Sequence, residues 1–126
     1  DIDIGMHINS GRDNIIENNI FVSCDQALRI MQYKSDPLYQ PGGDWGIYEN
    51  LIAMNYTEPP YSERYPTLLD LYEDGDPSLP RNNVVRRNIS YKNSTWLNLY
   101  TTPVEILTIE DNLDGINPLF VDIFLN

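Results

Sequence analysis

Two pairs of chemically active side chains recur at one separation in this chain. Asp3 and Asp25 are 22 residues apart, and His7 and Arg29 are also 22 residues apart. Paired carboxylates can act as acid and base on a glycosidic bond. A His or Arg side chain can remove a proton or stabilise charge at a uronate carbon. These four residues are therefore the catalytic candidates, provided that the fold brings them to one surface.

Side chains alternate across a β-strand, so the polar residues in register with these pairs are expected to share their face. Asp122 extends the column of His7 and Arg29, and Ser94 extends the column of Asp3 and Asp25. The insertion that begins directly after Met31 is expected to flank this patch, and one of its aromatic rings is expected to stack on a sugar. The predicted substrate-binding residues are Asn9, Lys34, Trp45, Tyr48, Asn98 and Tyr100.

A concealed repeat predicts the strands that carry these residues. Asn19, Asn88 and Asn112 each follow apolar or β-branched residues and precede another apolar residue, with separations of 69 and 24. Eight residues beyond each Asn begins a short strand that ends apolar-polar-apolar, and a fourth such strand lies 22 residues before the first. These four strands are expected at residues 5–8, 27–30, 96–99 and 120–123.

A period of 22 to 24 residues corresponds to one coil of a parallel β-helix. Three short strands separated by turns make one coil, and coils stack at a spacing of about 4.8 Å. Asn suits one of the turns, because it tolerates the left-handed conformation and its amide can bond the equivalent Asn of the next coil. We therefore expect an all-β fold in which residues 1–126 form one domain of about three or four coils.

The longer separation equals one coil plus about 45 residues, which predicts an insertion at about residues 32–80. It opens with Pro37, Pro41 and the glycines that follow, which indicate an irregular loop. Leucines and tyrosines at helical spacing predict a short helix over residues 62–73. Thr67 or Ser62 is a candidate cap for this helix.

Other residues are expected to have structural roles. The stacked register puts Arg86 and Arg87 beside Glu17 and Glu110, which predicts charge pairs between coils. Cys24 is the only cysteine, so it cannot form an internal disulfide and is expected to pack in the core.

The net charge of −11 restricts the classes of partner. Nucleic acids and anionic membranes are bound by cationic surfaces, so neither is an expected partner. An acidic polysaccharide would need a local cationic patch or bridging Ca²⁺. Carboxylates for such an ion are present at Asp13, Glu17 and Asp25, but their spacing is not diagnostic, and the acidic run 73–76 lacks the downstream Glu of a Ca²⁺ loop. No cofactor is predicted, with Ca²⁺ as the one candidate.

The segment Gly5–Phe21 resembles the recurrent coil consensus of the right-handed parallel β-helix repeat proteins, the pectate-lyase-like superfamily. Residues 60–66 and 79–88 resemble a subgroup of bacterial glycan-degrading proteins. The resemblance implies a right-handed β-helix, export to the periplasm or exterior, and a cleft along one parallel sheet flanked by long insertions. Members include lyases, glycoside hydrolases, epimerases and non-catalytic modules. No motif of one enzyme family is present, so no catalytic residue is carried over.

Three functions remain open at this stage. In the first, the chain is a secreted or periplasmic module that binds a polysaccharide or oligosaccharide and cleaves it as a lyase or glycoside hydrolase. In the second, the chain is a non-catalytic carbohydrate-binding or adhesion module. In the third, it forms the structural end coils of a larger enzyme. Residues 112–126 resemble the approach of such helices to their C-terminus. Because open solenoid ends expose apolar edges, we also expect self-association or a longer β-helix.

Overall fold

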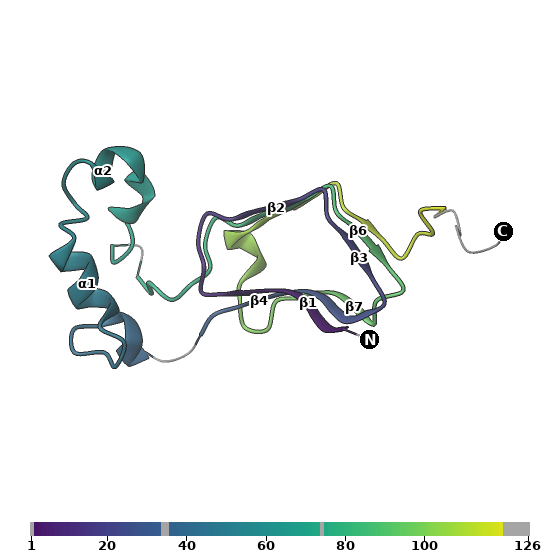
Figure 1. The fold of residues 1–126 in the computed structure, drawn as a ribbon, viewed down its shortest axis with the longest axis horizontal. Coiled ribbons are helices and arrows are strands. Elements are labelled where there is room, and N and C mark those ends of the chain that lie inside the picture. Colours follow the sequence, from purple (N-terminus) through teal and green to yellow (C-terminus); the bar gives the residue numbers. More distant parts are fainter. Residues whose placement is uncertain (1, 34–35, 74, 120–126) are drawn as a thin grey trace. The chain divides into compact units, whose positions relative to one another are not determined.

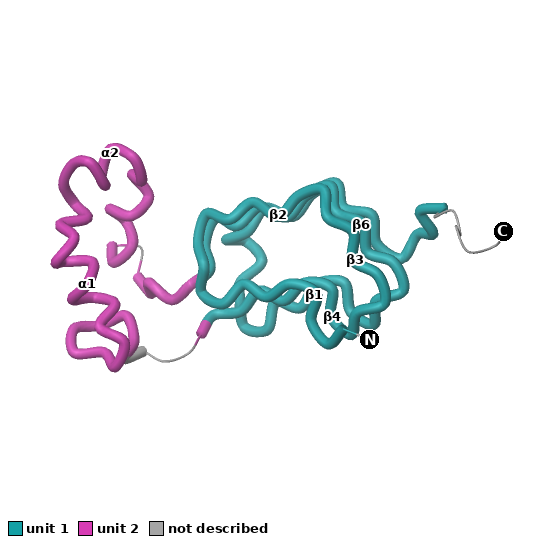
Figure 2. Tube along the Cα trace, in the orientation of Figure 1, with its two compact units in different colours: residues 1–32, 80–126 teal, residues 33–79 magenta. Residues whose placement is uncertain are grey.

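The computed structural model describes residues 2–33, 36–73 and 75–119, with the side chains of residues 36 and 37 left aside. The chain divides into two compact units, which are described separately (Figure 2). The first unit comprises residues 1–32 and 80–126, and the second unit comprises residues 33–79. Asp122 and the expected strand at 120–123 lie outside the described residues, and so does Lys34.

The first unit is built from strands in three successive rungs, each rung supplying one strand to each of three sheets (Figure 1). The first rung contains β1 (Ile2–Asn9), β2 (Ile15–Glu17) and β3 (Ile20–Val22). The second contains β4 (Cys24–Met31), β5 (Val84–Arg86) and β6 (Ile89–Tyr91). The third contains β7 (Thr95–Asn98), β8 (Thr108–Glu110) and β9 (Leu113–Asp114), with a 3₁₀ turn at Val104–Ile106.

All strand pairs in these sheets are parallel. Sheet A has the order β1-β4-β7, sheet B has β2-β5-β8, and sheet C has β3-β6-β9. The register pairs Ile16 with Val85 and Val85 with Ile109, which are the separations of 69 and 24 found in the sequence. The prediction of a mostly β fold is confirmed, and the arrangement is compatible with a β-helix-like repeat.

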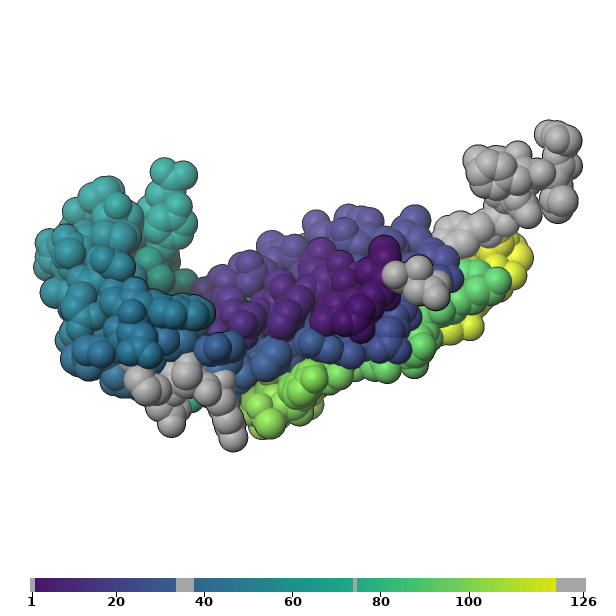
Figure 3. Space-filling model, turned by 60° about the horizontal axis from the view of Figure 1, so that its bottom comes forward, coloured from purple at the N-terminus to yellow at the C-terminus, as the bar shows by residue number. Residues whose placement is uncertain are grey.

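The core of the first unit lies between the three sheets and is most complete at the second rung. Ile16, Leu28, Ile30 and Val85 are buried, and half-buried apolar residues from the outer rungs pack around them. Removing a Leu or Ile side chain fully from water stabilises the fold by roughly 1.5–3 kcal/mol. Cys24 is also buried, as predicted. In the first rung, Ile16 and Phe21 are buried, while their neighbours Ile15 and Ile20 face outward and are exposed; Figure 3 shows the surface of this rung in purple.

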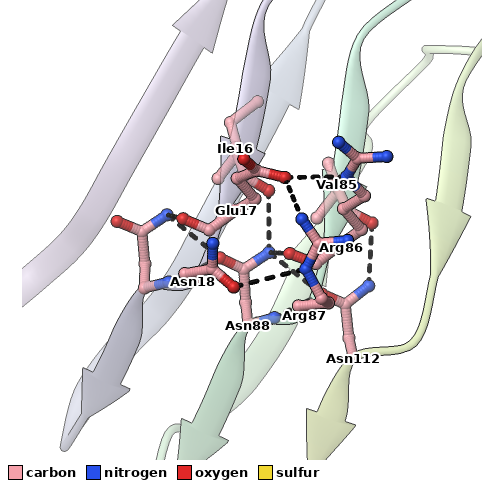
Figure 4. A network of polar contacts seen from close by, with 9 residues as sticks. Ile16, Glu17, Asn18, Val85, Arg86, Arg87, Asn88 and Asn112 are labelled. Carbon is pink, nitrogen blue, oxygen red and sulfur yellow. Dashed lines mark hydrogen bonds and ion pairs between the residues drawn. The ribbon is translucent and has the colours of Figure 1, made fainter.

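The predicted Asn column forms a hydrogen-bonded ladder (Figure 4). Asn19 Nδ2 donates to Asn88 Oδ1 at 3.0 Å, and Asn88 Nδ2 donates to Asn112 Oδ1 at 2.9 Å. Asn88 is 1% exposed, and its amide also donates to the backbone carbonyl of Ile16. A second pair, Asn14 and Asn83, is bonded in the same way at 2.9 Å. The amides therefore satisfy buried turn groups that water cannot reach.

The left-handed conformation belongs to the residue before each Asn and not to the Asn itself, which corrects our expectation. Asn18, Arg87 and Asp111 have φ values of 58°, 54° and 53°. One strained residue turns the chain, and the following Asn then has its side chain directed along the stack.

The predicted charge pairs between rungs are present for Glu17. Its Oε2 accepts a bond of 2.7 Å from Arg86 Nε and one of 2.5 Å from Arg87 Nη2. The hydrogen bond from Arg86 lowers the pKa of Glu17 and is the largest of the influences on it, and both arginine charges act in the same direction. The bond to Glu17 likewise raises the pKa of Arg86, and Glu110, its neighbour in the third rung, adds to that effect.

The second unit contains short helices and not the single helix expected at 62–73. Its elements are η1 (Asp36–Tyr39), α1 (Ile47–Ala53), α2 (Tyr61–Arg64) and η2 (Pro66–Leu68). Pro66 disfavours the helical conformation of the residue before it, and Tyr65 indeed has φ −133° and ψ 66°. The helix α2 therefore ends at Arg64, and neither Ser62 nor Thr67 caps a long helix. The helix α1 was not predicted.

Candidate functional site

His7, Arg29 and Asn98 form the column predicted on the outer face of sheet A. The register pairs His7 with Arg29 and Arg29 with Asn98 on successive rungs. His7 is exposed, while Arg29 and Asn98 are partly exposed. Their neighbours Met6, Ile8, Leu28, Ile30 and Leu97 turn inward to the core. The predicted register of this column is confirmed, and the chemical role of its residues stays a prediction.

The guanidinium group of Arg29 is held by two neighbours. Its Nε donates to Gln26 Oε1 at 2.9 Å, and its central carbon lies 5.3 Å from the ring centre of Tyr100. Among the described residues, its Nη atoms make no hydrogen bond or ion pair. The two Nη nitrogens of a positively charged, planar group, with four N–H donors, are thus available to a ligand at a fixed position.

Gln26 is the member of this site that sequence reasoning missed. Besides the bond from Arg29, its Oε1 accepts a bond of 3.0 Å from Asn98 Nδ2, which ties the second rung to the third. Strict alternation from Arg29 would turn Gln26 inward. The alternation breaks at Ala27 and Leu28, which are both fully buried, so Gln26 lies on the same side as Arg29. No signal in the sequence marks this break.

Glycine at position 5 is required where β1 runs beside this break. A Cβ atom there would come within 2.7 Å of the Ala27 carbonyl oxygen and 2.9 Å of the Phe21 ring. The first two rungs therefore approach each other too closely for any other residue at Gly5.

Asn9 and Tyr100 continue the face at its downstream end. Asn9 pairs with Met31, and the backbone N–H of Tyr100 donates to Asn98 Oδ1 at 3.0 Å. Tyr100 is 59% exposed and has a positive φ of 50°. Its ring therefore contacts Arg29 while most of its surface stays open to solvent, as the sequence-based prediction of a binding residue requires.

Asp3, Asp25 and Ser94 lie together beside a separate open pocket of about 510 Å³. Its remaining lining residues are Ile2, Ser23, Cys24 and Lys92. Lys92 was not predicted. It follows β6 in a left-handed turn, with φ 56°, and its ammonium group lies 5.2 Å from the ring centre of Tyr91. Only the stacking of the two turns, not a local motif, brings it to the pocket that Asp25 also lines.

The structure does not bring the four catalytic candidates into one cluster. Asp3 lies four residues before His7 on β1, and Asp25 lies four residues before Arg29 on β4. Four residues of extended chain span about 13 Å. The candidates therefore form two pairs at different positions along sheet A, and no single bound sugar bond is expected to contact both.

Of the predicted wall residues, Trp45 and Tyr48 belong to the second unit and Lys34 lies outside the described residues. Tyr48 is half-buried and packs edge-on against Tyr72, with ring centres 5.4 Å apart. Trp45 is 63% exposed and stacks on Tyr33. Tyr48 therefore stabilises its own unit, whereas Trp45 presents an aromatic ring to solvent. That they wall the face of sheet A stays a prediction.

The carboxylates considered for Ca²⁺ are engaged in different ways. Glu17 is bonded to two arginines, and Asp13 accepts a bond of 3.1 Å from Asn82 Nδ2. Within the described ranges, no three His, Cys, Asp or Glu side chains are grouped so that they could hold a metal ion. Over the same residues, every helix is too short or too polar to span a bilayer.

The fold and site together define a mostly β chain of stacked parallel strands with a polar outer face on sheet A. Comparison of the chain with protein-family models, curated proteins and solved structures finds no match.

Proposed function

We propose that the first unit is a right-handed parallel β-helix of the pectate-lyase-like type and that the chain is an exported, secreted or periplasmic, carbohydrate-binding module. Its ligand in this proposal is a polysaccharide or oligosaccharide. The proposed binding surface is the outer face of sheet A around His7, Arg29 and Asn98. The repeat of 22 to 24 residues, the Asn ladder and the resemblance of Gly5–Phe21 to the coil consensus support the fold.

The observation that carries the proposal is the fixed guanidinium group of Arg29. Gln26 and Tyr100 hold it, and its Nη atoms remain available among the described residues. Arginine side chains lose conformational entropy when they bind, and a guanidinium that is already held in place loses less. His7, Asn98 and Tyr100 add donors, acceptors and an aromatic surface, which are the groups that bind sugar hydroxyls and rings.

Binding is favoured over catalysis because the predicted catalytic residues form two separate pairs. Glycosidic hydrolysis with two carboxylates needs both beside one bond. Asp3 and Asp25 alone meet this condition, since adjacent rungs lie about 4.8 Å apart. That spacing approaches the short carboxylate separation of retaining enzymes and is below that of inverting enzymes. A glycoside hydrolase with its site at the 510 Å³ pocket is therefore the second candidate.

The experiment compares binding and cleavage on a panel of neutral and acidic polysaccharides, with and without Ca²⁺. Affinity is measured by calorimetry, and products are followed as new reducing ends and as ultraviolet absorbance of unsaturated uronates. Arg29→Ala and His7→Ala test sheet A, Asp25→Asn tests the pocket, and Arg87→Ala is the control. Arg87 carries the same charge as Arg29 but contacts Glu17 and Asn18 instead.

We expect binding that Arg29→Ala weakens at least tenfold and Arg87→Ala leaves unchanged. New reducing ends that Asp25→Asn abolishes would favour the hydrolase, and unsaturated products that Arg29→Ala abolishes would favour a lyase. If no polysaccharide binds at all, the proposal fails. The chain would then be better explained as the structural end coils of a larger enzyme.

A further inference from the structure

Aromatic and acidic residues are concentrated in the second unit. Residues 33–79 hold seven of the nine tyrosines and Trp45, and they hold nine Asp and Glu residues against two Lys and Arg residues. Aromatic rings provide apolar surface with little flexibility, whereas a strongly acidic unit repels anions. This composition favours a ligand that offers apolar surface and carries no negative charge.

Part of this aromatic content forms the interior of the unit. Tyr72 packs against Tyr48, and its hydroxyl group donates to the Tyr39 carbonyl at 2.7 Å. Burial raises the pKa of Tyr72 above its ordinary value of 10.0. Leu38 and Tyr56 are buried in the same unit. These contacts give structural roles to the side chains of Tyr48, Tyr56 and Tyr72, but they do not account for the exposed indole of Trp45.

Trp45 is presented by a loop that is fixed at several points. Gly43 N donates to Gln40 O at 3.0 Å, and Gly46 N donates to Gly43 O at 2.9 Å. Gly42 N donates to the Glu49 carboxylate at 2.7 Å, and this bond lowers the pKa of Glu49. The loop also depends on positive φ values at Gly42 and Gly46, 80° and 59°. Because the loop is hydrogen-bonded to itself and to α1, the position of Trp45 is defined without a ligand.

Tyr33 supports the indole ring of Trp45. The two ring centres are 5.9 Å apart, and the ring planes are inclined by only 26°. Trp45 nevertheless keeps 63% of its surface exposed, and Tyr33 keeps 37%. Large exposed aromatic rings on a fixed support are typical of a surface that is covered on binding.

We propose that Tyr33 and Trp45 form a stacking platform for an uncharged pyranose ring. A sugar such as β-glucose or β-galactose gathers C–H bonds on one ring face, and this face matches the apolar surface of an indole. The acidic surroundings disfavour a uronate or a sulfated sugar at this position. This inference rests on the proposed glycan binding, and it assigns the platform a preference for uncharged sugars that is independent of sheet A.

The test uses the full chain and two probes, a neutral β-linked glucose hexasaccharide and a uronate hexasaccharide. Binding is measured by calorimetry and by the change in tryptophan emission that the sugar causes. The variants are Trp45→Ala, Trp45→Phe and the control Ile52→Ala, which removes an exposed aliphatic residue of α1. Thermal unfolding of each variant checks that the fold is retained.

We expect Trp45→Ala to weaken binding of the neutral sugar about tenfold or more, Trp45→Phe to weaken it less, and Ile52→Ala to have no effect. The emission change should be present in the wild-type protein and absent in Trp45→Phe. Neutral binding that survives Trp45→Ala but is lost in Arg29→Ala would overturn the platform and keep the sheet A proposal. Neutral binding that neither Trp45→Ala nor Arg29→Ala weakens would overturn both proposals. A dimer in sedimentation that only Trp45→Ala dissociates would overturn the platform alone, because a second copy of the chain would then occupy it.

Discussion

Gln26 Oε1 lies 2.9 Å from Arg29 Nε, although the two residues are three positions apart on one strand. Side chains three apart on a regular strand face opposite sides, so this bond depends on the break in alternation at Ala27 and Leu28. Both of those residues are fully buried. The irregular strand therefore positions the guanidinium group that carries the proposed function.

Replacing Gln26 by Met should free the Arg29 side chain without unfolding the protein. Met has a similar volume but no good acceptor, so Arg29 Nε–H and Asn98 Nδ2–H both lose a partner. We expect faster exchange of the Arg29 Nε proton with water in nitrogen-15 NMR spectra. The Nε proton of Arg86, which is bonded to Glu17, provides the internal control. Glycan affinity should fall with the loss of preorganisation, and an unchanged Arg29 signal would show that Gln26 does not hold it.

Replacing Asn88 by Ala should destabilise the first unit strongly. The change removes the side-chain amide of Asn88. Its oxygen accepts hydrogen bonds from Asn19, and its nitrogen donates to Asn112 and to the Ile16 carbonyl. Buried groups left without a partner cost about 1–3 kcal/mol each, so we expect a loss of about 3 kcal/mol in the free energy of unfolding. Urea unfolding followed by circular dichroism measures this.

The matched control for that variant is Asn112→Ala, in the third rung of the same column. Asn112 is half-buried and makes fewer bonds of this kind, so its loss should cost about 1 kcal/mol. Equal effects of the two substitutions would contradict a ladder in which the central amide is the most important.

Replacing Gly5 by Ala should also be destabilising, here through steric overlap. The new Cβ would lie 2.7 Å from the backbone oxygen of Ala27, which cannot move without shifting β4. Overpacking of this kind costs about 1–3 kcal/mol. Gly11→Ala is the comparison, because its nearest neighbour is the Asn14 side chain at 3.0 Å, which can adjust. Unfolding midpoints should therefore fall more for Gly5→Ala, and the reverse order would refute the close approach of the two rungs.

The repeat in the sequence was sufficient to predict which residues stack, because each rung must present the same inward and outward pattern to its neighbours. Asn19, Asn88 and Asn112 are in one column, and His7 faces Arg29 as expected. Features that depend on local backbone conformation were not predictable in this way. The positive φ values at Asn18 and Arg87 come from turn geometry that Asn and Arg do not specify by themselves.

The same distinction explains what was missed in the site and the second unit. Gln26 was not among the predicted site residues, because strict alternation from Arg29 across Ala27 and Leu28 would turn it inward. The helix over 62–73 was predicted from apolar spacing, although Pro66 disfavours a helical conformation for Tyr65. Residues 33–79 contain no copy of the repeat, so the positions of Trp45 and Tyr33 relative to each other could not be derived from it.

The last prediction concerns acid denaturation and the pair of Glu17 with Arg86. The bond from Arg86 holds the pKa of Glu17 below its ordinary value of 4.5 in the folded state. A carboxyl group with a lowered folded pKa stabilises the fold above its unfolded pKa, and this contribution disappears as the pH falls through the folded pKa. The difference in urea midpoint between wild type and Glu17→Gln should therefore be constant near pH 7 and shrink toward zero below pH 4.5. Glu58→Gln changes the charge equally without removing an arginine pair and is the control. A Glu17→Gln difference that stays constant down to pH 3 would show that the charge of Glu17 contributes nothing to stability.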